Sequence, residues 1–257
     1  GDNLLIRPWI RTLVRINKSF IVQRSASIRE KLASSKQLSE YMHYAIAEKR
    51  ENIWIAQREG RAKDSDDRTQ EALLKMMAMG GEGTPLERIK SLNLVPLSIS
   101  YEYDPCDFLK AKEFQQKRDI EGFKKSKQDD RDNMRTGIFG YKGRVHYCAA
   151  APVNTWIDRL ADLPKADFFK ALAEGIDRAI HSGYLITPGN CVAADELAGE
   201  ERYVGNGYTP EQKAVFDKYI DERLALIDLP NKDEAFLRRM MLEMYANPLK
   251  NYEAARR

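Results

Sequence analysis

The feature that most constrains the fold of this chain is an alternation of apolar runs and helical patterns in its N-terminal part. Three runs have the composition of strands: "SFIVQR" (19–24), "NIWIAQ" (52–57) and "NLVPLSISYEY" (93–103). When strands alternate with helices, each helix carries the chain back over the sheet, so that successive strands lie parallel. The alternation predicts an α/β fold, with a central mixed, largely parallel sheet and flanking helices.

Helical patterns fill the intervals between these runs. Residues 25–52 carry apolar side chains at helical spacing, with an early break expected, and a second pattern, residues 69–79, ends at two glycines. A short third helix begins with Thr84 as its N-cap. A further strand is expected within residues 140–154, so that residues 1–154 are predicted to form the α/β domain.

The remainder of the chain reads as helical. Residues 106–135 are expected to form one or two exposed helices, and residues 155–257 a helical extension packed on the first domain. The last helix is expected to stop at Pro248. Its apolar stripe has the pattern of a core face: Phe236, Leu237, Met240, Met241 and Met244.

Charge is divided unevenly along the chain. Residues 1–150 hold 28 Lys and Arg and 21 Asp and Glu, a balance of +7, whereas residues 151–257 hold 14 and 18, a balance of −4. The basic half is therefore where an anionic partner is expected, and nucleic acid, phosphorylated metabolites and anionic lipid all fit at this point.

Cysteine usage and hydropathy limit the setting of the protein. Cys106, Cys148 and Cys191 are widely spaced and odd in number, which favours a reduced, cytosolic setting over secretion. The sequence has no zinc-binding pattern, no signal peptide and no run of 18 apolar residues. Because the chain starts at Gly1 with residues that are already patterned, we expect native sequence to precede it.

A basic helix is expected near the N-terminus, in "RPWIRTLVRINK" (7–18). Four cations share one of its faces: Arg7, Arg11, Arg15 and Lys18. A basic stripe beside a Trp-bearing apolar side is typical of a helix lying on anionic lipid. A surface helix with solvated arginines has the same pattern, and both interpretations stay open.

The segment "QREGRAKD" (57–64) is the candidate binding site. It follows an apolar run, and Gly60 allows the backbone to approach an oxyanion closely. Phosphate contacts are expected from Arg58, Arg61 or Lys63. Glu59 would repel phosphate, so its expected role is to hold a ligand hydroxyl or to orient the arginines. A phosphorylated polyol meets both demands, and an ordinary solvated loop is the alternative.

Three motifs in chain order resemble the blocks of the glycerolipid acyltransferases, which act on glycerol 3-phosphate and 1-acylglycerol 3-phosphate. "FIVQR", ending at Arg24, is similar to the second block of that family. "IAQREGRAKD" resembles the third block, with Glu59 and Gly60 in place, and "LVPLSISYE" the fourth, with Val95 and Pro96. The likeness covers roughly residues 1–105 and does not reach the helical C-terminal part.

The chain departs from the family pattern in two places. Arg61 directly follows Gly60, and Ala62 stands where the family usually has Arg, so that phosphate contact by Arg61 implies a shifted register. The first block, a His followed by an Asp after four intervening residues, is absent. The three histidines, His43, His146 and His181, are followed at that spacing by Glu, Ala and Ile, and structural roles are expected for them.

The resemblance implies an acyltransferase that moves a fatty acyl group from acyl-CoA or acyl carrier protein to the hydroxyl of a glycerol phosphate or lysophospholipid. In the family a His acts as general base, and the arginines of the second and third blocks hold the acceptor phosphate. No cofactor or metal is implied. The general base is expected upstream of this chain, which is then inactive alone. The location implied is cytoplasmic, peripheral at the inner face of the membrane.

Two other functions remain open from the sequence. The chain has the charge of a non-catalytic binding protein for anionic lipid or nucleic acid, although no nucleic-acid recognition motif is present and no nucleic-acid partner is expected. Within the same superfamily, the altered third block also suits an amine-bearing lysolipid as acceptor.

Overall fold

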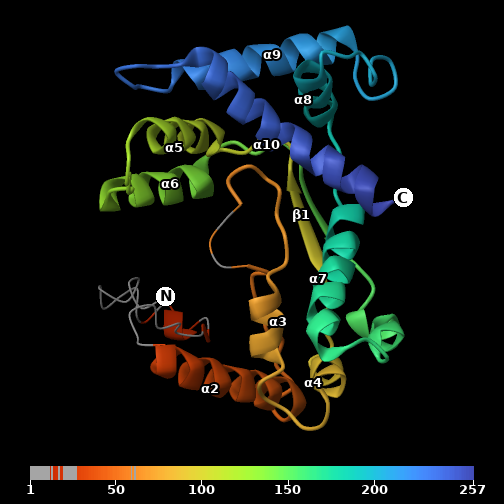
Figure 1. Cartoon of the computed structure of the whole chain (residues 1–257). Helices are drawn as coiled ribbons and strands as arrows, with labels where there is room; N and C mark the ends of the chain where they lie inside the picture. The colour runs from red at the N-terminus through yellow and green to blue at the C-terminus, as the bar shows by residue number, and fades with distance from the viewer. Residues whose placement is uncertain (1–11, 13, 17, 20–27, 59, 61) are drawn as a thin grey trace. The chain divides into compact units, whose positions relative to one another are not determined.

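The computed structural model describes residues 12, 14–16, 18–19, 28–58, 60 and 62–257, and this part of the chain is mostly helical (Figure 1). Its helices and strands are, in chain order, α2 (Ile28–Ala47), α3 (Glu71–Met77), α4 (Pro85–Ser91), β1 (Leu97–Tyr101), α5 (Asp107–Asp119), α6 (Lys127–Phe139), β2 (Val145–Ala149), α7 (Lys165–Ser182), α8 (Pro188–Ala198), α9 (Pro210–Ala225) and α10 (Glu234–Ala255). Two 3-10 turns, Val153–Thr155 and Ile157–Leu160, precede α7.

The chain divides into two compact units, and neither is continuous in sequence. The first consists of Gly1–Glu59, Thr69–Leu94 and Pro152–Glu174. The second consists of Gly60–Arg68, Val95–Ala151 and Gly175–Arg257.

In the first unit, α2 and the end of α3 meet at a glycine. The Ser39 hydroxyl of α2 donates to the carbonyl of Met77 and accepts from the N–H of Gly80, both at 2.8 Å. A Cβ on Gly80 would lie 2.7 Å from the backbone nitrogen of Glu40. The predicted glycine stop is therefore also a contact point, because only glycine lets the two backbones approach so closely.

The predicted start of α4 is confirmed by its capping contacts. The Thr84 hydroxyl accepts from the N–H of Glu87 at 3.3 Å, and the Glu87 carboxylate accepts from the N–H of Thr84 at 2.6 Å. This reciprocal pair satisfies two of the donors that a helix N-terminus leaves open, and Pro85 needs none.

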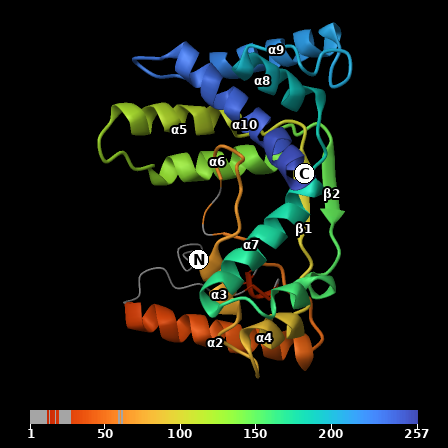
Figure 2. The same ribbon diagram turned by 45° about the vertical axis from the view of Figure 1, so that its right-hand side comes forward.

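In the second unit, β1 and β2 form an antiparallel pair, with Ile99 opposite Tyr147 and Tyr101 opposite Val145 (Figure 2). The serines of β1 face the rest of the unit: Ser98 donates to the carbonyl of Gly183 at 3.0 Å, and Ser100 accepts from the N–H of Leu185 at 3.0 Å. The opposite face is apolar yet open, since Tyr101, Val145 and Tyr147 are exposed.

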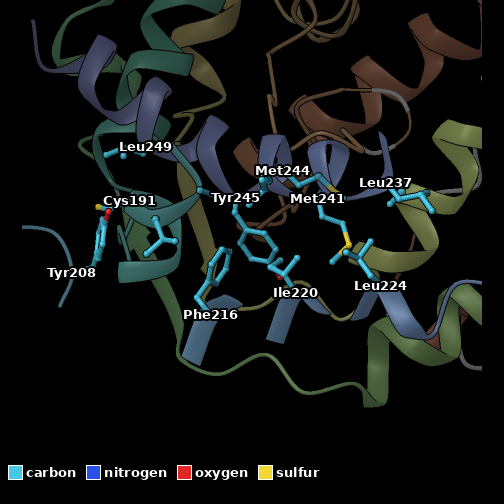
Figure 3. Packing of buried hydrophobic residues seen from close by; sticks show 14 of the residues in the cluster. Cys191, Tyr208, Phe216, Ile220, Leu224, Leu237, Met241, Met244, Tyr245 and Leu249 are labelled. Carbon is cyan, nitrogen blue, oxygen red and sulfur yellow. The ribbon is translucent and has the colours of Figure 1, made fainter. Parts of the chain in front are cut away.

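The main core of the second unit lies where α10 packs with α8, α9 and α5. The predicted core stripe of α10 is confirmed at Leu237, Met241 and Met244, which are buried. They pack with Phe216, Ile220 and Leu224 of α9, as Figure 3 shows. Phe236 and Met240, at the margins of the stripe, are only partly buried.

The predicted fold class is wrong. Among the described residues the sheet has only two strands, and they are antiparallel, so a central and largely parallel sheet is not present. Residues 52–57 do not form a strand, and Trp54 is exposed. A short apolar run shows only that a segment avoids water, whereas a strand also requires a hydrogen-bonding partner, which local sequence does not specify. Of the run at 19–24, only Ser19 is among the described residues.

Three helix predictions also need correction. The early break expected in the first long helix is not found within its described part, because α2 is continuous from Ile28 to Ala47. The last helix does not stop at Pro248 but runs on to Ala255, so α10 contains a proline in its interior. The helices expected to be exposed at 106–135 are only partly so: α5 buries Asp107, Ala111, Glu113 and Gln115.

Candidate functional site

Several of the predicted site residues lie outside the described part of the chain. These are Arg24, Glu59 and Arg61 of the binding site and Arg7 and Arg11 of the basic helix. Gly60 is described and exposed, with φ of +77°. That conformation is left-handed and strains any residue with a Cβ, which accounts for a glycine here. Arg58 is half-buried.

Lys63 lies in a cluster of lysines around one buried carboxylate. It forms an ion pair with Oε1 of Glu113 on α5. Lys117 Nζ lies 3.1 Å from the same oxygen, and Lys125 Nζ lies 2.5 Å from Oε2, although that second contact lacks hydrogen-bond geometry. The ammonium groups of Lys63, Lys117 and Lys125 are therefore gathered around this one carboxylate.

Ammonium groups that gather in one place are what an anionic ligand requires. The Glu113 side chain is only 3% exposed. It therefore pairs with the lysines from the buried side of the cluster and is not accessible to solvent. The Lys117 side chain is 50% exposed and therefore open to a ligand. A compact dianion such as a phosphate monoester would gain from two or three ammonium groups that converge, because each contact is a charge-assisted hydrogen bond. We call Lys63, Glu113, Lys117 and Lys125 the lysine cluster.

The rest of the loop is fixed by contacts to α10. Arg68 donates to Oδ1 of Asn251 at 2.7 Å, and Asn251 Nδ2 donates to the carboxylate of Asp66 at 2.9 Å. Asn247 Nδ2 donates to the carbonyl of Asp64 at 2.8 Å. Asp64, Asp66 and Arg68, which make these contacts, come just after Lys63 in the sequence. The backbone next to Lys63 is therefore held in place by α10.

The remaining predicted residues lie elsewhere. Val95 is exposed, and buried Pro96 accepts a hydrogen bond at its carbonyl from Ala150. Neither residue contributes a polar side chain to a site. In the basic helix, Arg15 is exposed and Lys18 forms an ion pair with Glu51 at 2.5 Å.

The described histidines make contacts that suit structural residues. His43 is hydrogen-bonded through its two ring nitrogens to the Ser91 hydroxyl at 3.0 Å and to the Met77 carbonyl at 3.1 Å. His181 is buried, with Nε2 3.0 Å from the carbonyl of Asp67. His146 lies in β2.

A second polar group, which the sequence analysis missed, surrounds Asp107 at the start of α5. Its fully buried carboxylate accepts from the hydroxyls of Tyr219 at 2.6 Å and Tyr245 at 2.8 Å, and from Nε of Arg223 at 2.7 Å. Burial raises the pKa of Asp107 above its ordinary value, and Arg223 opposes that rise. Burial and the nearby Asp107 charge raise the pKa of Tyr219 and of Tyr245 as well.

We regard the Asp107 group as structural. Its carboxylate has no exposed surface, so substrate atoms do not reach it, and its partners connect α5 to α9 and α10. A sequence signal for it existed: Tyr219 and Arg223 are four residues apart in a helix and share a face. The sequence does not show that Asp107 lies next to this helix face in space, because Asp107 is distant along the chain.

Among the described residues no group of His, Cys, Asp and Glu side chains is arranged to hold a metal ion. Within the same residues, no helix combines the length and apolarity needed to span a bilayer. No family model, curated protein or solved structure shows significant similarity to this chain.

Proposed function

We propose that this chain belongs to an acyltransferase of the glycerolipid type and that the lysine cluster, which includes Lys63 of the Glu-Gly motif, holds the phosphate of its acceptor. The acceptor is a glycerol phosphate or a lysophospholipid, and the acyl donor is a thioester of coenzyme A or acyl carrier protein. The observation that carries the proposal is the position of Lys63. It belongs to the Glu-Gly motif by sequence, and it lies with two more lysines around Glu113.

The support for the acyltransferase class is the order of the motifs, not the architecture. Arg24, then Glu59 and Gly60, then Val95 and Pro96 follow one another as the family blocks do. The parallel sheet that the resemblance implies is not the fold observed among the described residues. The proposal therefore depends on the binding chemistry of named residues, and it is testable without reference to the fold.

The chemical requirement on the site is modest. In acyl transfer the acceptor hydroxyl attacks the thioester carbonyl, the C–S bond breaks and the hydroxyl proton passes to a base, with no change of oxidation state. We assign acceptor binding to this chain and assign it no general base. The proposed location is the cytoplasmic face of a membrane, where a lysophospholipid acceptor resides.

The proposal is tested by titrating the protein with sn-glycerol 3-phosphate in a calorimeter, with glycerol as the uncharged comparison. We expect the phosphate ester to bind and glycerol not to bind. Lys63→Met and Lys117→Met should each weaken binding about 10- to 100-fold, the equivalent of one lost charge-assisted hydrogen bond. Lys218→Met is the matched control, because this exposed lysine of α9 lies outside the lysine cluster.

Two results would count against the proposal. Equal affinity of the Lys63→Met, Lys117→Met and control variants would remove the lysine cluster from the site. Absence of glycerol 3-phosphate binding, together with binding to generic DNA that falls steeply with salt, would favour a nucleic-acid-binding protein instead.

A further inference from the structure

The solvent-facing side of α6 is unusual for a surface helix because it is apolar as well as basic. Its inner side faces α5: the backbone carbonyl of Asn133 accepts from the Cys106 thiol at 3.4 Å, and a Cβ on Gly137 would lie 3.5 Å from that sulfur. At helical spacing, the residues opposite this side include Arg131, Arg135 and Ile138, and all three are exposed.

The apolar side chains at the end of α6 are among the most exposed in the described part of the protein. Phe139 is 81% exposed and Tyr141 is 75% exposed. Ile138 and Met134 are also exposed, one turn apart on the helix. Single exposed apolar residues are common, but here four lie within eight consecutive residues, which is what an apolar interaction surface requires.

We propose that this surface is a docking site for an anionic lipid bilayer. We name it the α6 surface and define it by Arg131, Met134, Arg135, Ile138, Phe139 and Tyr141. The inference goes beyond the proposed function and does not depend on it, since a binding protein without acyltransferase activity would dock in the same way. It also differs from the predicted basic helix near the N-terminus, which is a separate segment.

Charge complementarity identifies the lipid as the occupant. Residues 133–157 contain no Asp or Glu. Of their cations, Arg135 and Lys142 lie at α6, whereas Arg144 is paired with Glu102 at 3.2 Å. Lys142 donates to the carbonyls of Ile138 and Gly140 at 3.1 and 2.9 Å, which places a positive charge at the end of α6. The acidic residues of α6 lie in the first half of the helix, at Asp129, Asp130 and Asp132.

Other occupants fit this surface less well. A second copy of the chain would bring like charges together around Arg131 and Arg135, which disfavours a symmetric dimer. Nucleic acid is bound through aromatic stacking and phosphate contacts, yet two of the four apolar side chains, Met134 and Ile138, have no ring to stack. Aliphatic and aromatic side chains that enter the acyl boundary, with arginines at the headgroups, are the pattern of an interfacial helix.

The test is a vesicle flotation assay with the whole chain. Vesicles of phosphatidylcholine with phosphatidylglycerol are compared with vesicles of phosphatidylcholine alone. We expect binding to the anionic vesicles. The double variant Ile138→Ser, Phe139→Ser should lower the fraction bound at least about fivefold, because two apolar anchors are lost. Arg131→Gln with Arg135→Gln should lower binding to anionic vesicles and leave binding to neutral vesicles unchanged.

The matched control is Val215→Ser with Leu226→Ser, which removes two exposed apolar side chains from α9 and the residue after it. It should bind vesicles as the original chain does. All three double variants should unfold at the same temperature as the original chain, since the changed side chains are exposed. Vesicle binding that survives Ile138→Ser, Phe139→Ser, or that falls equally in the control, would overturn the proposal. So would salt-sensitive binding to DNA in the absence of vesicle binding.

Discussion

Helices α6 and α10 carry similar apolar residues, and the structure treats them in opposite ways. In α10, Leu237, Met241 and Met244 are buried against α8 and α9 (Figure 3). In α6, Met134 and Ile138 are exposed. Both helices have apolar residues at helical spacing, so the period alone does not distinguish a core face from an open one.

The difference lies in what surrounds the apolar residues. Next to the core stripe of α10 lies Tyr245, whose hydroxyl donates a hydrogen bond to the buried carboxylate of Asp107. The exposed side of α6 carries Arg131 and Arg135 instead. Arginine keeps its guanidinium in water even when its stem is covered. Helix α10 also carries arginines, but Arg238 is partly buried and forms ion pairs with Glu196 and Asp221, whereas Arg131 and Arg135 are exposed. This distinction can be tested.

The largest loss of unfolding free energy is expected when the buried Asp107 group, which connects α5 to α9 and α10, is disrupted. Asp107→Ala removes the carboxylate that holds Tyr245, Tyr219 and Arg223, and leaves a mostly buried guanidinium without its counter-charge. The loss of one partner of a buried ion pair costs about 3–5 kcal/mol of unfolding free energy. Urea unfolding at neutral pH measures it.

Tyr219→Phe is the graded control for that change, because it deletes one hydroxyl and keeps the ring. It should cost about 1 kcal/mol. If Asp107→Ala lost less than Tyr219→Phe, the idea that this group anchors α10 would be wrong.

The second prediction compares α10 and α6 directly, because the same substitution, Met to Ala, is made in each helix. Met241→Ala creates a cavity in the core and should cost about 2–5 kcal/mol. Met134→Ala removes an equally large side chain from the open side of α6 and should change the unfolding free energy by less than about 0.5 kcal/mol. Urea unfolding midpoints of the two variants would separate them clearly. Similar losses would mean that α6 is covered in solution.

The smallest effect concerns the pH dependence of the start of α10. The backbone N–H of Phe236, followed by Arg118, lowers the pKa of Asp233 below its ordinary value. On acidification the unfolded chain therefore binds this proton first, so the contribution of Asp233 is complete above about pH 4 and is lost as pH falls through the folded pKa.

Asp233→Asn keeps a capping oxygen but does not titrate. Its urea midpoint should fall less steeply with pH between about 5 and 3 than that of the original chain. Parallel curves for the two proteins would show that Asp233 does not contribute to acid sensitivity.

Helix starts could be predicted from the sequence because their chemistry is local. Thr84 caps α4 as predicted, and together with Glu87 it forms a reciprocal cap. Local rules failed at Pro248, because an interior proline is tolerated where packing of the flanking turns compensates for the lost hydrogen bond, and Leu249 just beyond it is buried in the core.

The sheet could not be predicted, because strand pairing is a relation between distant segments. The run at 97–101 does form a strand, and its partner is the run at 145–149. The equally apolar residues 53–56 remain unpaired. The residues of a run do not determine which strand it pairs with or in which direction. The expected parallel pairing was inferred only from the alternation of strands and helices along the chain.

The candidate site was predicted only in part, for the same reason. Lys63 is predicted from its place in the Glu-Gly motif, whereas for residues 106–135, which include Lys117 and Lys125, the sequence predicts only exposed helices. Their common neighbour, Glu113, was not expected to be buried. A charged helix reveals which of its residues faces inward only when the packing around it is known.

The contacts between Arg68 and Asn251 have a consequence for biosynthesis. The two residues are separated by 183 positions, so the 60–68 segment leaves the ribosome long before its partner exists. At synthesis rates of about 5–20 residues per second, that interval is roughly 10 to 40 s. During this interval the loop that carries Lys63 lacks its hydrogen-bonding partners on α10, and it is accessible to chaperones and proteases. The proposed ligand-binding loop is thus expected to reach its final contacts only after α10 has left the ribosome.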